Sequence, residues 1–412
     1  MRCITEESES RLPVEILDGI FSYAKPSTLA RLALVCHTYQ GLATRILYRH
    51  IPSLSLPLAM RCLETLVSKP SLAAHTRTCE IGDTSFLNVS SMELLPPSFF
   101  DLLRHALHNM HRLTELTFLL NGPTSHVLPG APFKLTKLTA SCNFDPTFAS
   151  WLAEQTNLRA AIFCGNFTTG VTLPMDALPS LRRVVAAPVT LACVVPGRPI
   201  REVELCLVHP WSLNREVLQT TIRIIAFSKG PLDSLRIISH LAEPPETVLS
   251  ALEAIPSGLN SITKFALHAV SGSITEDILS GLPSILSQFT GLKSLTLFSK
   301  NKYDPLHTAA STRALATACH ATCASLESVT FPGATYVHNR CYGWITLRDL
   351  AELLTAREQS LQHRVSEFCK REAPLDEKWC VVQSTRERGL GGLKSELGVE
   401  RDGGVSVVVI AA

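Results

Sequence analysis

The chain has 412 residues, which exceeds the length of one ordinary domain and predicts two domains or a repeat array. Apolar residues make up 46% of the sequence and charged residues only 18%, which excludes global disorder. The 38 basic and 36 acidic residues give a formal net charge of +2, so the charge indicates neither a nucleic-acid-binding protein nor a polybasic membrane contact.

The hydropathy pattern argues against a membrane protein. The longest apolar runs, such as Val405 to Ile410, are far shorter than the roughly 18 to 20 residues that span a bilayer. Residues 1–11 are polar and acidic, unlike a secretory signal. The thirteen cysteines are scattered and odd in number, which is typical of reduced thiols. We therefore expect an intracellular protein of the cytoplasm or nucleus, with no membrane contact.

Residues 12–51 have the apolar spacing of three short helices. Pro13 suits a first helical turn, and the pair Lys25-Pro26 ends the first helix, because proline disfavours helix at the residue before it. Forty residues bury little core on their own, so several apolar side chains must face either the rest of the chain or a partner. On the pattern alone, a helical cap on a larger domain and a partner-binding module are both open.

The same forty residues resemble an F-box, of the kind abundant in mushroom-forming fungi. The match runs from Leu12-Pro13 to Leu47-Tyr48-Arg49, with Ala24 and Tyr39 at positions where leucine and tryptophan are common. The resemblance implies docking to the adaptor subunit of cullin–RING ubiquitin ligases, through apolar anchors on helix faces. The residues that it assigns to adaptor binding are Leu12, Pro13, Glu15, Ile16, Leu17, Ile20, Phe21, Leu29, Leu32, Val35, Cys36 and Tyr39.

Residues 52–335 repeat a short strand-like pattern, L-x-x-L-x-L with substitutions. Its first apolar position falls at Leu113, Leu135, Leu158, Leu181, Ile200, Leu232, Ile262, Leu292 and Leu326. The early spacings of 22 to 23 residues are those of leucine-rich repeats, and the later spacings leave room for a helix in each unit. We therefore predict an α/β fold in which the N-terminal helices precede a leucine-rich-repeat-like solenoid with a parallel sheet. A Rossmann-like sheet is the rival fold.

Asparagine and helix signals support the repeat. Asn121, Asn143 and Asn166 occupy the ninth position of three successive units, where a side-chain amide can bridge neighbouring coils. Helical patterns lie between the strand signals. They fall near residues 99–110, 146–157, 214–227, 245–255, 275–289 and 308–323.

The composition changes after residue 335, where charged residues become about twice as frequent. We expect domains at 12–51 and 52–335, a flexible segment at 1–11, and a charged cap helix with a mobile tail at 336–412. The helix is predicted at residues 347–368, and Val405 to Ile410 is a candidate edge strand.

Signatures of catalysis, metals and cofactors are missing from the sequence. The glycines of Gly391-Gly392-Leu393-Lys394-Ser395 do not fit a phosphate-binding loop, and no nucleophile elbow or H-E-x-x-H motif occurs. Cys319, His320 and Cys323 lack a second ligand pair for zinc, and His105, His108 and His111 are more typical of an exposed helix end. We predict neither an enzyme nor a cofactor.

The leading hypothesis is a substrate receptor of a ubiquitin ligase, in which the repeat array binds a target protein. Its expected target-binding residues, beside the apolar strand positions, are Glu115, Lys137, Arg183, Glu202, Glu204, Arg236 and Lys264. These charges of mixed sign suit a protein partner better than nucleic acid. The alternatives are a protein-binding scaffold whose N-terminal helices only cap the array, and an intracellular hydrolase with an unrecognised pocket.

Overall fold

The computed structural model describes residues 12–82, 95–207, 213–299, 309–331, 334–339, 343–372, 400–402 and 405–407. The chain forms two compact units, Met1–His338 and Asn339–Ala412. The segment expected to be flexible, 1–11, and most of the expected mobile tail lie outside the described residues.

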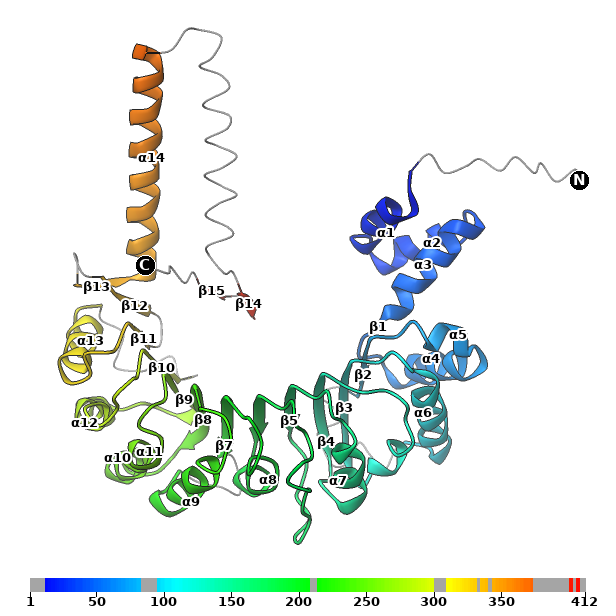
Figure 1. The fold of residues 1–412 in the computed structure, drawn as a ribbon, viewed down its shortest axis with the longest axis horizontal. Coiled ribbons are helices and arrows are strands. Elements are labelled where there is room, and N and C mark those ends of the chain that lie inside the picture. Colours follow the sequence, from blue (N-terminus) through cyan, green and yellow to red (C-terminus); the bar gives the residue numbers. More distant parts are fainter. Residues whose placement is uncertain are drawn as a thin grey trace, which may run out of the picture. The chain divides into compact units, whose positions relative to one another are not determined.

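Three helices form a small bundle at the start of the first unit (Figure 1). They are α1 (Val14–Ser22), α2 (Pro26–Leu32) and α3 (His37–Arg49). Prolines precede α1 and begin α2, as the sequence predicts. Leu17, Phe21, Leu29 and Leu42 bury their side chains together, and the Phe21 and Tyr39 rings meet edge to face at 5.2 Å. Asp18 and Arg45 join α1 to α3 by an ion pair of 2.6 Å.

The rest of the first unit alternates strands with helices. Its strands are β1 (His50–Ile51), β2 (Thr78–Ile81), β3 (Glu115–Gly122), β4 (Lys137–Cys142), β5 (Ala160–Phe163), β6 (Arg183–Ala186), β7 (Glu202–Leu207), β8 (Ser234–Leu241), β9 (Lys264–Gly272), β10 (Ser294–Ser299), β11 (Ser328–Phe331) and β12 (Ala334–Asn339). Its helices are α4 (Leu56–Ser68), α5 (Pro70–Ala73), α6 (Pro97–Asn109), α7 (Pro146–Ala153), α8 (Pro188–Val194), α9 (Arg215–Ile225), α10 (Pro245–Leu252), α11 (Ala254–Leu259), α12 (Glu276–Leu286) and α13 (Ala309–Thr322), with the short 3-10 helix η3 (Ser125–Val127).

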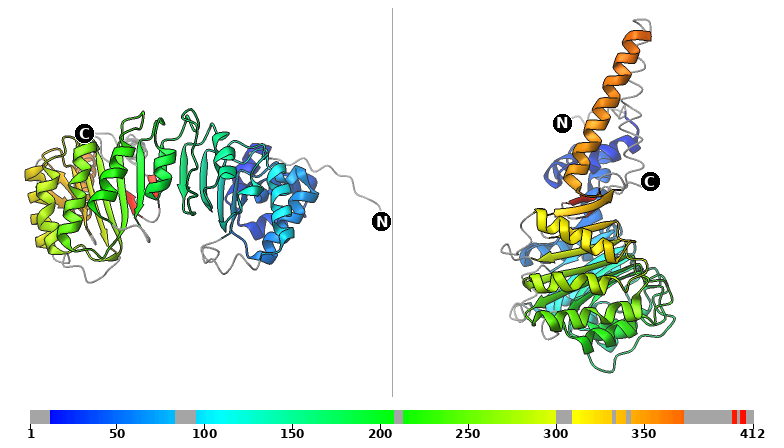
Figure 2. Two further views of the ribbon diagram at one scale, coloured as in Figure 1. Left: turned by 90° about the horizontal axis from the view of Figure 1, so that it is seen from below. Right: turned by 90° about the vertical axis from the view of Figure 1, so that its left-hand side faces the viewer.

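These strands lie in one sheet in the order in which they occur along the chain, all parallel except the β11–β12 pair. The helices cover one face of the sheet and leave the other open (Figures 1 and 2). Alternate strand residues are buried, as in β3, where Leu116, Phe118 and Leu120 point into the core that Leu103 and Leu107 of α6 also enter. An unbroken strand order with helices on one face excludes the Rossmann-like rival, whose strand order reverses at a switch point.

The strand register aligns equivalent positions of successive units. Glu115 pairs with Lys137, Lys137 with Ala160, Ala160 with Arg183, and Arg183 with Glu202. The same register therefore brings residues that are about 20 positions apart in the sequence to neighbouring places on the open face.

The second unit contains β13 (Gly343–Thr346), the long helix α14 (Leu347–Glu372) and an antiparallel pair of short strands. That pair consists of β14 (Glu400–Asp402) and β15 (Val405–Val407). The candidate strand at Val405 to Ile410 is thus observed over its first three residues, paired with β14.

The structure confirms an α/β fold with N-terminal helices followed by a mostly parallel sheet. The predicted helices are all present, whereas α4, α5 and α8 were not anticipated and α11 extends beyond the predicted segment 245–255. At Asn143 the expected side-chain bridge is not made through Oδ1, which is buried and accepts no hydrogen bond from the described residues. The neighbouring coils are joined here by the backbone, since the backbone N–H of Asn143 donates to Gly122 O at 2.9 Å.

Candidate protein-binding surfaces

Helix α1 carries two apolar stripes, of which the three-helix bundle buries only one. Leu17 and Phe21, four residues apart, lie in the bundle core, where Leu17 is only 3% exposed. Ile16 and Ile20 form the adjacent stripe and remain 52% and 53% exposed. A helix that rests on one core normally has a single apolar face, so the second stripe has the character of a binding surface.

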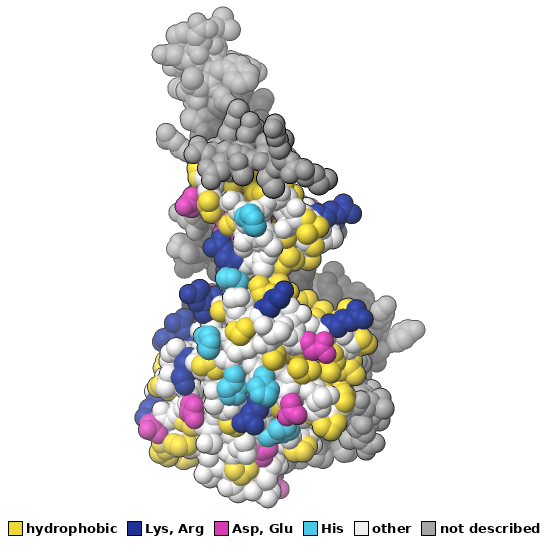
Figure 3. All heavy atoms as spheres, turned by 90° about the vertical axis from the view of Figure 1, so that its right-hand side faces the viewer, with side chains coloured by type: hydrophobic (Ala, Val, Ile, Leu, Met, Phe, Trp, Pro, Cys, Tyr) yellow, Lys and Arg dark blue, Asp and Glu magenta, His cyan; other side chains and the backbone are white. Residues whose placement is uncertain are grey.

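A second exposed apolar segment connects α2 to α3. Leu34 is 87% exposed and Val35 is 64% exposed, and the Cys36 thiol beside them is also exposed. Figure 3 shows hydrophobic side chains at the surface of these N-terminal helices, in its upper part. If the N-terminal helices only capped the array, Ile16, Leu17 and Val35 would be expected to pack against the repeats. Ile16 and Val35 instead face solvent, and Leu17 is buried in the bundle itself.

The twelve residues that the F-box resemblance assigns to adaptor binding therefore divide into two groups. Those with exposed side chains are Leu12, Pro13, Glu15, Ile16, Ile20, Val35 and Cys36. Those that are buried or partly buried in the bundle are Leu17, Phe21, Leu29, Leu32 and Tyr39. The second group builds the core that holds the first group in position. Sequence reasoning missed exposed Val14, Tyr23 and Leu34, which fall outside the predicted core stripes.

The open face of the sheet is the second candidate surface. All seven expected target-binding residues lie on it, at the first or third positions of strands β3, β4 and β6 to β9, with half-buried or exposed side chains. Most of them pair with one another across neighbouring strands. Lys137 contacts Glu115 at 3.3 Å, Arg183 lies 3.9 Å from Glu202 and 3.7 Å from Glu204, and Arg236 contacts Glu204 at 3.0 Å. The exposed pairs Lys137–Glu115 and Arg183–Glu202 contribute about 0–1 kcal/mol each, whereas Glu204 is only 15% exposed.

An apolar stretch continues this open face toward the strand ends. Register pairs Cys206 with Ile238, Ile238 with His268, and His268 with Phe298 across β7 to β10. The Phe298 ring is exposed and lies 5.3 Å from the His268 ring. Partial burial beside Arg236 lowers the pKa of His268, which favours its neutral form. The open face thus combines ionic and apolar contacts, the composition of a protein–protein interface.

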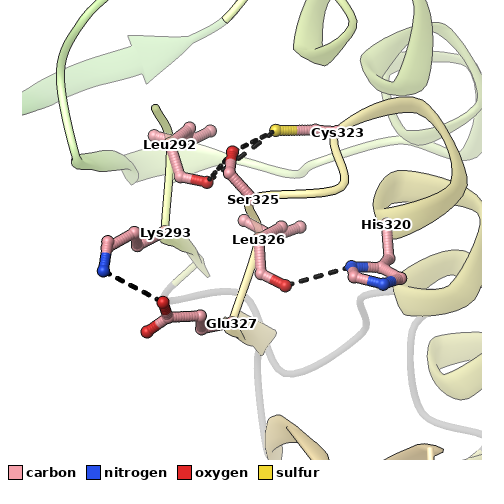
Figure 4. Close-up of polar contacts among 7 residues, drawn as sticks. All are labelled: Leu292, Lys293, His320, Cys323, Ser325, Leu326 and Glu327. Carbon is pink, nitrogen blue, oxygen red and sulfur yellow. Dashed lines mark hydrogen bonds and ion pairs between the residues drawn. The ribbon is translucent and has the colours of Figure 1, made fainter. Parts of the chain in front are cut away.

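The cysteine and histidine groups noted in the sequence make structural contacts. His320 Nδ1 lies 3.1 Å from Leu326 O, and the Cys323 thiol lies near Leu292 O and Ser325 (Figure 4). His105 and His108 each place Nδ1 at 2.8 Å from a carbonyl oxygen one turn earlier in α6. These contacts hold His105, His108, His320 and Cys323 in position within the fold.

The hydrolase hypothesis requires a pocket with converging polar groups. A small cavity lies between α4, β2 and α6, and its walls are almost entirely apolar, including Leu63, Leu66, Ile81 and Phe99. Glu80 is the one charged residue among its described lining residues. The lining also includes the thiols of Cys62 and Cys79, and burial raises the pKa of both, so neither is an activated nucleophile.

The thiols differ strongly in their surroundings, which leads to a first prediction. Burial raises the pKa of Cys142, Cys206 and Cys319 to about 12, so these groups stay protonated and unreactive. We expect iodoacetamide at pH 8 to alkylate exposed Cys36 well before these three, as measured by peptide mass spectrometry. Equal alkylation rates of Cys36 and the three buried thiols in the native protein would contradict this prediction.

The raised pKa values of these thiols also affect the pH dependence of folding. Their contribution to the stability of the folded state is fully present below pH about 9, the unfolded value, and is lost as the pH rises toward about 12.

Within the described residues, no helix is long and apolar enough to cross a membrane. Residues 10–51 match the F-box-like family model, which covers the three-helix bundle. The chain thus carries an F-box-like domain, and this domain supports a role in substrate recognition by SCF-type ubiquitin ligases in general. F-box domains bind the adaptor subunit of cullin–RING ligases. Proteins that contain them typically connect other proteins and are not themselves enzymes. No curated protein matches the chain.

Proposed function

We propose that this protein is a non-catalytic substrate receptor of a cullin–RING ubiquitin ligase. The exposed stripe of α1 and the α2–α3 segment dock the adaptor, and the open face of the sheet binds a target protein for ubiquitination. The observation that carries the proposal is the unburied stripe of Ile16 and Ile20 within a domain that matches the F-box-like model.

The strand–helix units of residues 52–335 are, in this proposal, a degenerate leucine-rich-repeat solenoid. Three features support this interpretation: the sequential parallel strands, the helices on one face only, and the early spacings of 22 to 23 residues. A sheet of this kind offers a broad rigid surface, which suits the recognition of a folded or extended protein target.

A non-ubiquitin scaffold is the second candidate, in which the same sheet binds proteins and the N-terminal helices serve only as a cap. The exposed Ile16 and Val35 favour the receptor over this candidate, because a helix that served only as a cap would not need a second apolar stripe.

Charge introduced into the exposed stripe provides the test. We expect Ile16→Asp/Ile20→Asp to abolish co-purification with the adaptor subunit, because the variant places two carboxylates in an apolar interface. The bundle should remain folded, since both positions are exposed. The measurements are adaptor pull-down with the purified full chain and circular dichroism.

Leu58→Asp provides the matched control. Leu58 lies on α4 and is 53% exposed, like Ile20, but it stands outside the F-box-like domain. We expect this variant to bind the adaptor normally. Retained adaptor binding by the folded double variant would refute the receptor function.

A further inference from the structure

A row of arginines crosses the sheet at the beginnings of strands β5, β6 and β7. Arg159, Arg182 and Arg201 each immediately precede a strand, and their backbones are linked in series. The Arg182 amide donates to Arg159 O at 2.9 Å, and the Arg201 amide donates to Arg182 O at 2.8 Å. Since adjacent strands lie about 4.8 Å apart, the three residues span about 10 Å. All three side chains are exposed.

Acidic groups near this row are too few to neutralise it. Arg201 lies 3.8 Å from Asp233, whereas Arg159 and Arg182 have no ion pair among the described residues. On the adjacent open face, Arg183 and Arg236 share the carboxylate of Glu204, and Glu202 gives Arg183 a second contact. In all, these five guanidinium groups have only three carboxylates as ion-pair partners. Farther along the same edge, Lys293 and Glu327 neutralise each other at 3.0 Å, whereas Arg77 before β2 is a single arginine that has no ion pair among the described residues.

We infer that this arginine row, Arg159, Arg182 and Arg201, binds an acidic segment of the target protein in extended conformation. The inference rests on the proposed function, because it specifies the class of target that binds at the open face and at the edge of the sheet beside it. A guanidinium group presents a planar fork of donors that matches a carboxylate, and an anionic partner relieves the repulsion between neighbouring arginines. A span of about 10 Å corresponds to about three residues of extended chain. The segment therefore carries two or three acidic residues close together.

Three considerations favour a protein segment over nucleic acid. The net charge of the whole chain is only +2. The row is short, so a segment with two or three acidic residues can end within it, whereas a phosphate backbone continues past it to Glu202 and Glu204, which would repel it. Apolar Ile162 lies on the open face of β5, where it can contact side chains that flank the acidic residues.

Peptide binding by the full chain, measured both alone and with the adaptor added, tests the inference. The probe is a fluorescein-labelled decapeptide with a central Asp-Glu-Asp-Glu run. The comparison probes are its Asn-Gln-Asn-Gln counterpart, a version with two phosphoserines in the run, and decathymidylate. Fluorescence anisotropy at low and moderate salt measures affinity. We expect tighter binding of the acidic peptide than of the amide peptide, and weakening as salt rises.

Arg159→Glu/Arg182→Glu should weaken binding of the acidic peptide by about tenfold or more. Arg104→Glu/Arg223→Glu is the matched control, since it reverses two exposed arginines on helices α6 and α9 and changes the net charge equally. The control should change the affinity by less than about twofold. Preferential binding of the phosphoserine peptide would identify phosphate as the source of the anion at the same site.

Several results would overturn the inference: equal affinity for the acidic and amide peptides, equal effects of the two double variants, or tighter binding of decathymidylate than of either anionic peptide. Adaptor co-purification is measured in parallel and should be unchanged in both variants. Loss of acidic-peptide binding with the adaptor retained would therefore reflect the arginine row alone. Failure of adaptor docking by the unmodified protein would refute the proposed function without affecting the peptide result.

Discussion

Replacement of Arg198 by alanine is expected to lower the free energy of unfolding by about 3 kcal/mol or more. The Arg198 side chain is only 1% exposed, and its guanidinium donates to four backbone carbonyls. Nε bonds Ala177 O at 2.9 Å, and Nη2 bonds Pro174 O at 2.6 Å. Nη1 bonds Pro196 O at 2.9 Å and Cys193 O at 3.2 Å.

The size of the effect follows from what these bonds hold together. Residues 164–182, between β5 and β6, contain no helix, so the backbone carbonyls of Pro174 and Ala177 have no helical partners. The Arg198 guanidinium takes the place of such helical donors. It also bonds the carbonyl oxygens of Cys193 and Pro196, at and just after the end of α8. Truncation would leave the buried Ala177 O without its Arg198 donor and would remove three part-buried hydrogen bonds, and each hydrogen bond to a charged group contributes about 1.5–3 kcal/mol. Burial also lowers the pKa of Arg198, as expected for a cation removed from water, although an arginine stays charged at neutral pH.

Urea unfolding followed by circular dichroism measures the change. Arg198→Lys should recover only part of the stability, because an ammonium group cannot reproduce the planar fork that reaches carbonyls on both sides. Arg201→Ala is the control, since Arg201 is exposed and its pair with Asp233 is long, so its loss should cost less than about 1 kcal/mol. Similar stabilities of the alanine variants at 198 and 201 would contradict the structural role of Arg198.

The α/β class and most helices were predictable because they depend on local signals. The recurring pattern L-x-x-L-x-L alternates apolar and polar residues with the period of a half-buried strand, and the structure places strands at each occurrence. Helix starts carry signals of the same local kind. Asp145, Asn214 and Thr275 accept hydrogen bonds from the first turns of α7, α9 and α12.

The arginine row could have been found from the same alignment of repeats. Arg159, Arg182 and Arg201 each follow directly the first apolar position of three successive units, at Leu158, Leu181 and Ile200. The sequence could not reveal which arginines are neutralised. That depends on contacts such as Arg183–Glu204, which the parallel register brings together over a separation of 21 residues.

Two features of the structure, the burial of Arg198 and the choice between Ile16 and Leu17 in α1, depend on long-range packing and could not be predicted from the sequence for that reason. A charged residue such as Arg198 is normally exposed, and its burial arises from carbonyls up to 24 residues away in the chain. In α1, neighbouring Ile16 and Leu17 have similar hydropathy, so composition cannot decide which one enters the core. The position of α3 decides it, because Leu42 and Ala43 complete the cluster around Leu17.

Replacement of Phe21 by alanine should unfold the F-box-like domain and thereby abolish adaptor binding. Phe21 is 4% exposed, and the bundle core contains only four other buried residues, Leu17, Leu29, Leu42 and Ala43. Truncation of a buried phenylalanine costs about 3–5 kcal/mol, which matches or exceeds the stability that a bundle of about forty residues can supply. The variant also loses the edge-to-face contact with Tyr39.

This mechanism differs from that of Ile16→Asp/Ile20→Asp, and the two can be separated by experiment. Both variants should lose the adaptor, but only Phe21→Ala should make the N-terminal helices sensitive to limited proteolysis and to hydrogen exchange. Phe21→Leu is the conservative control, since it retains most of the apolar volume and should keep much of the binding. Protected helices in Phe21→Ala together with lost adaptor binding would instead place Phe21 in the interface. Since its side chain is almost fully enclosed by α1, α2 and α3, we expect the unfolding result.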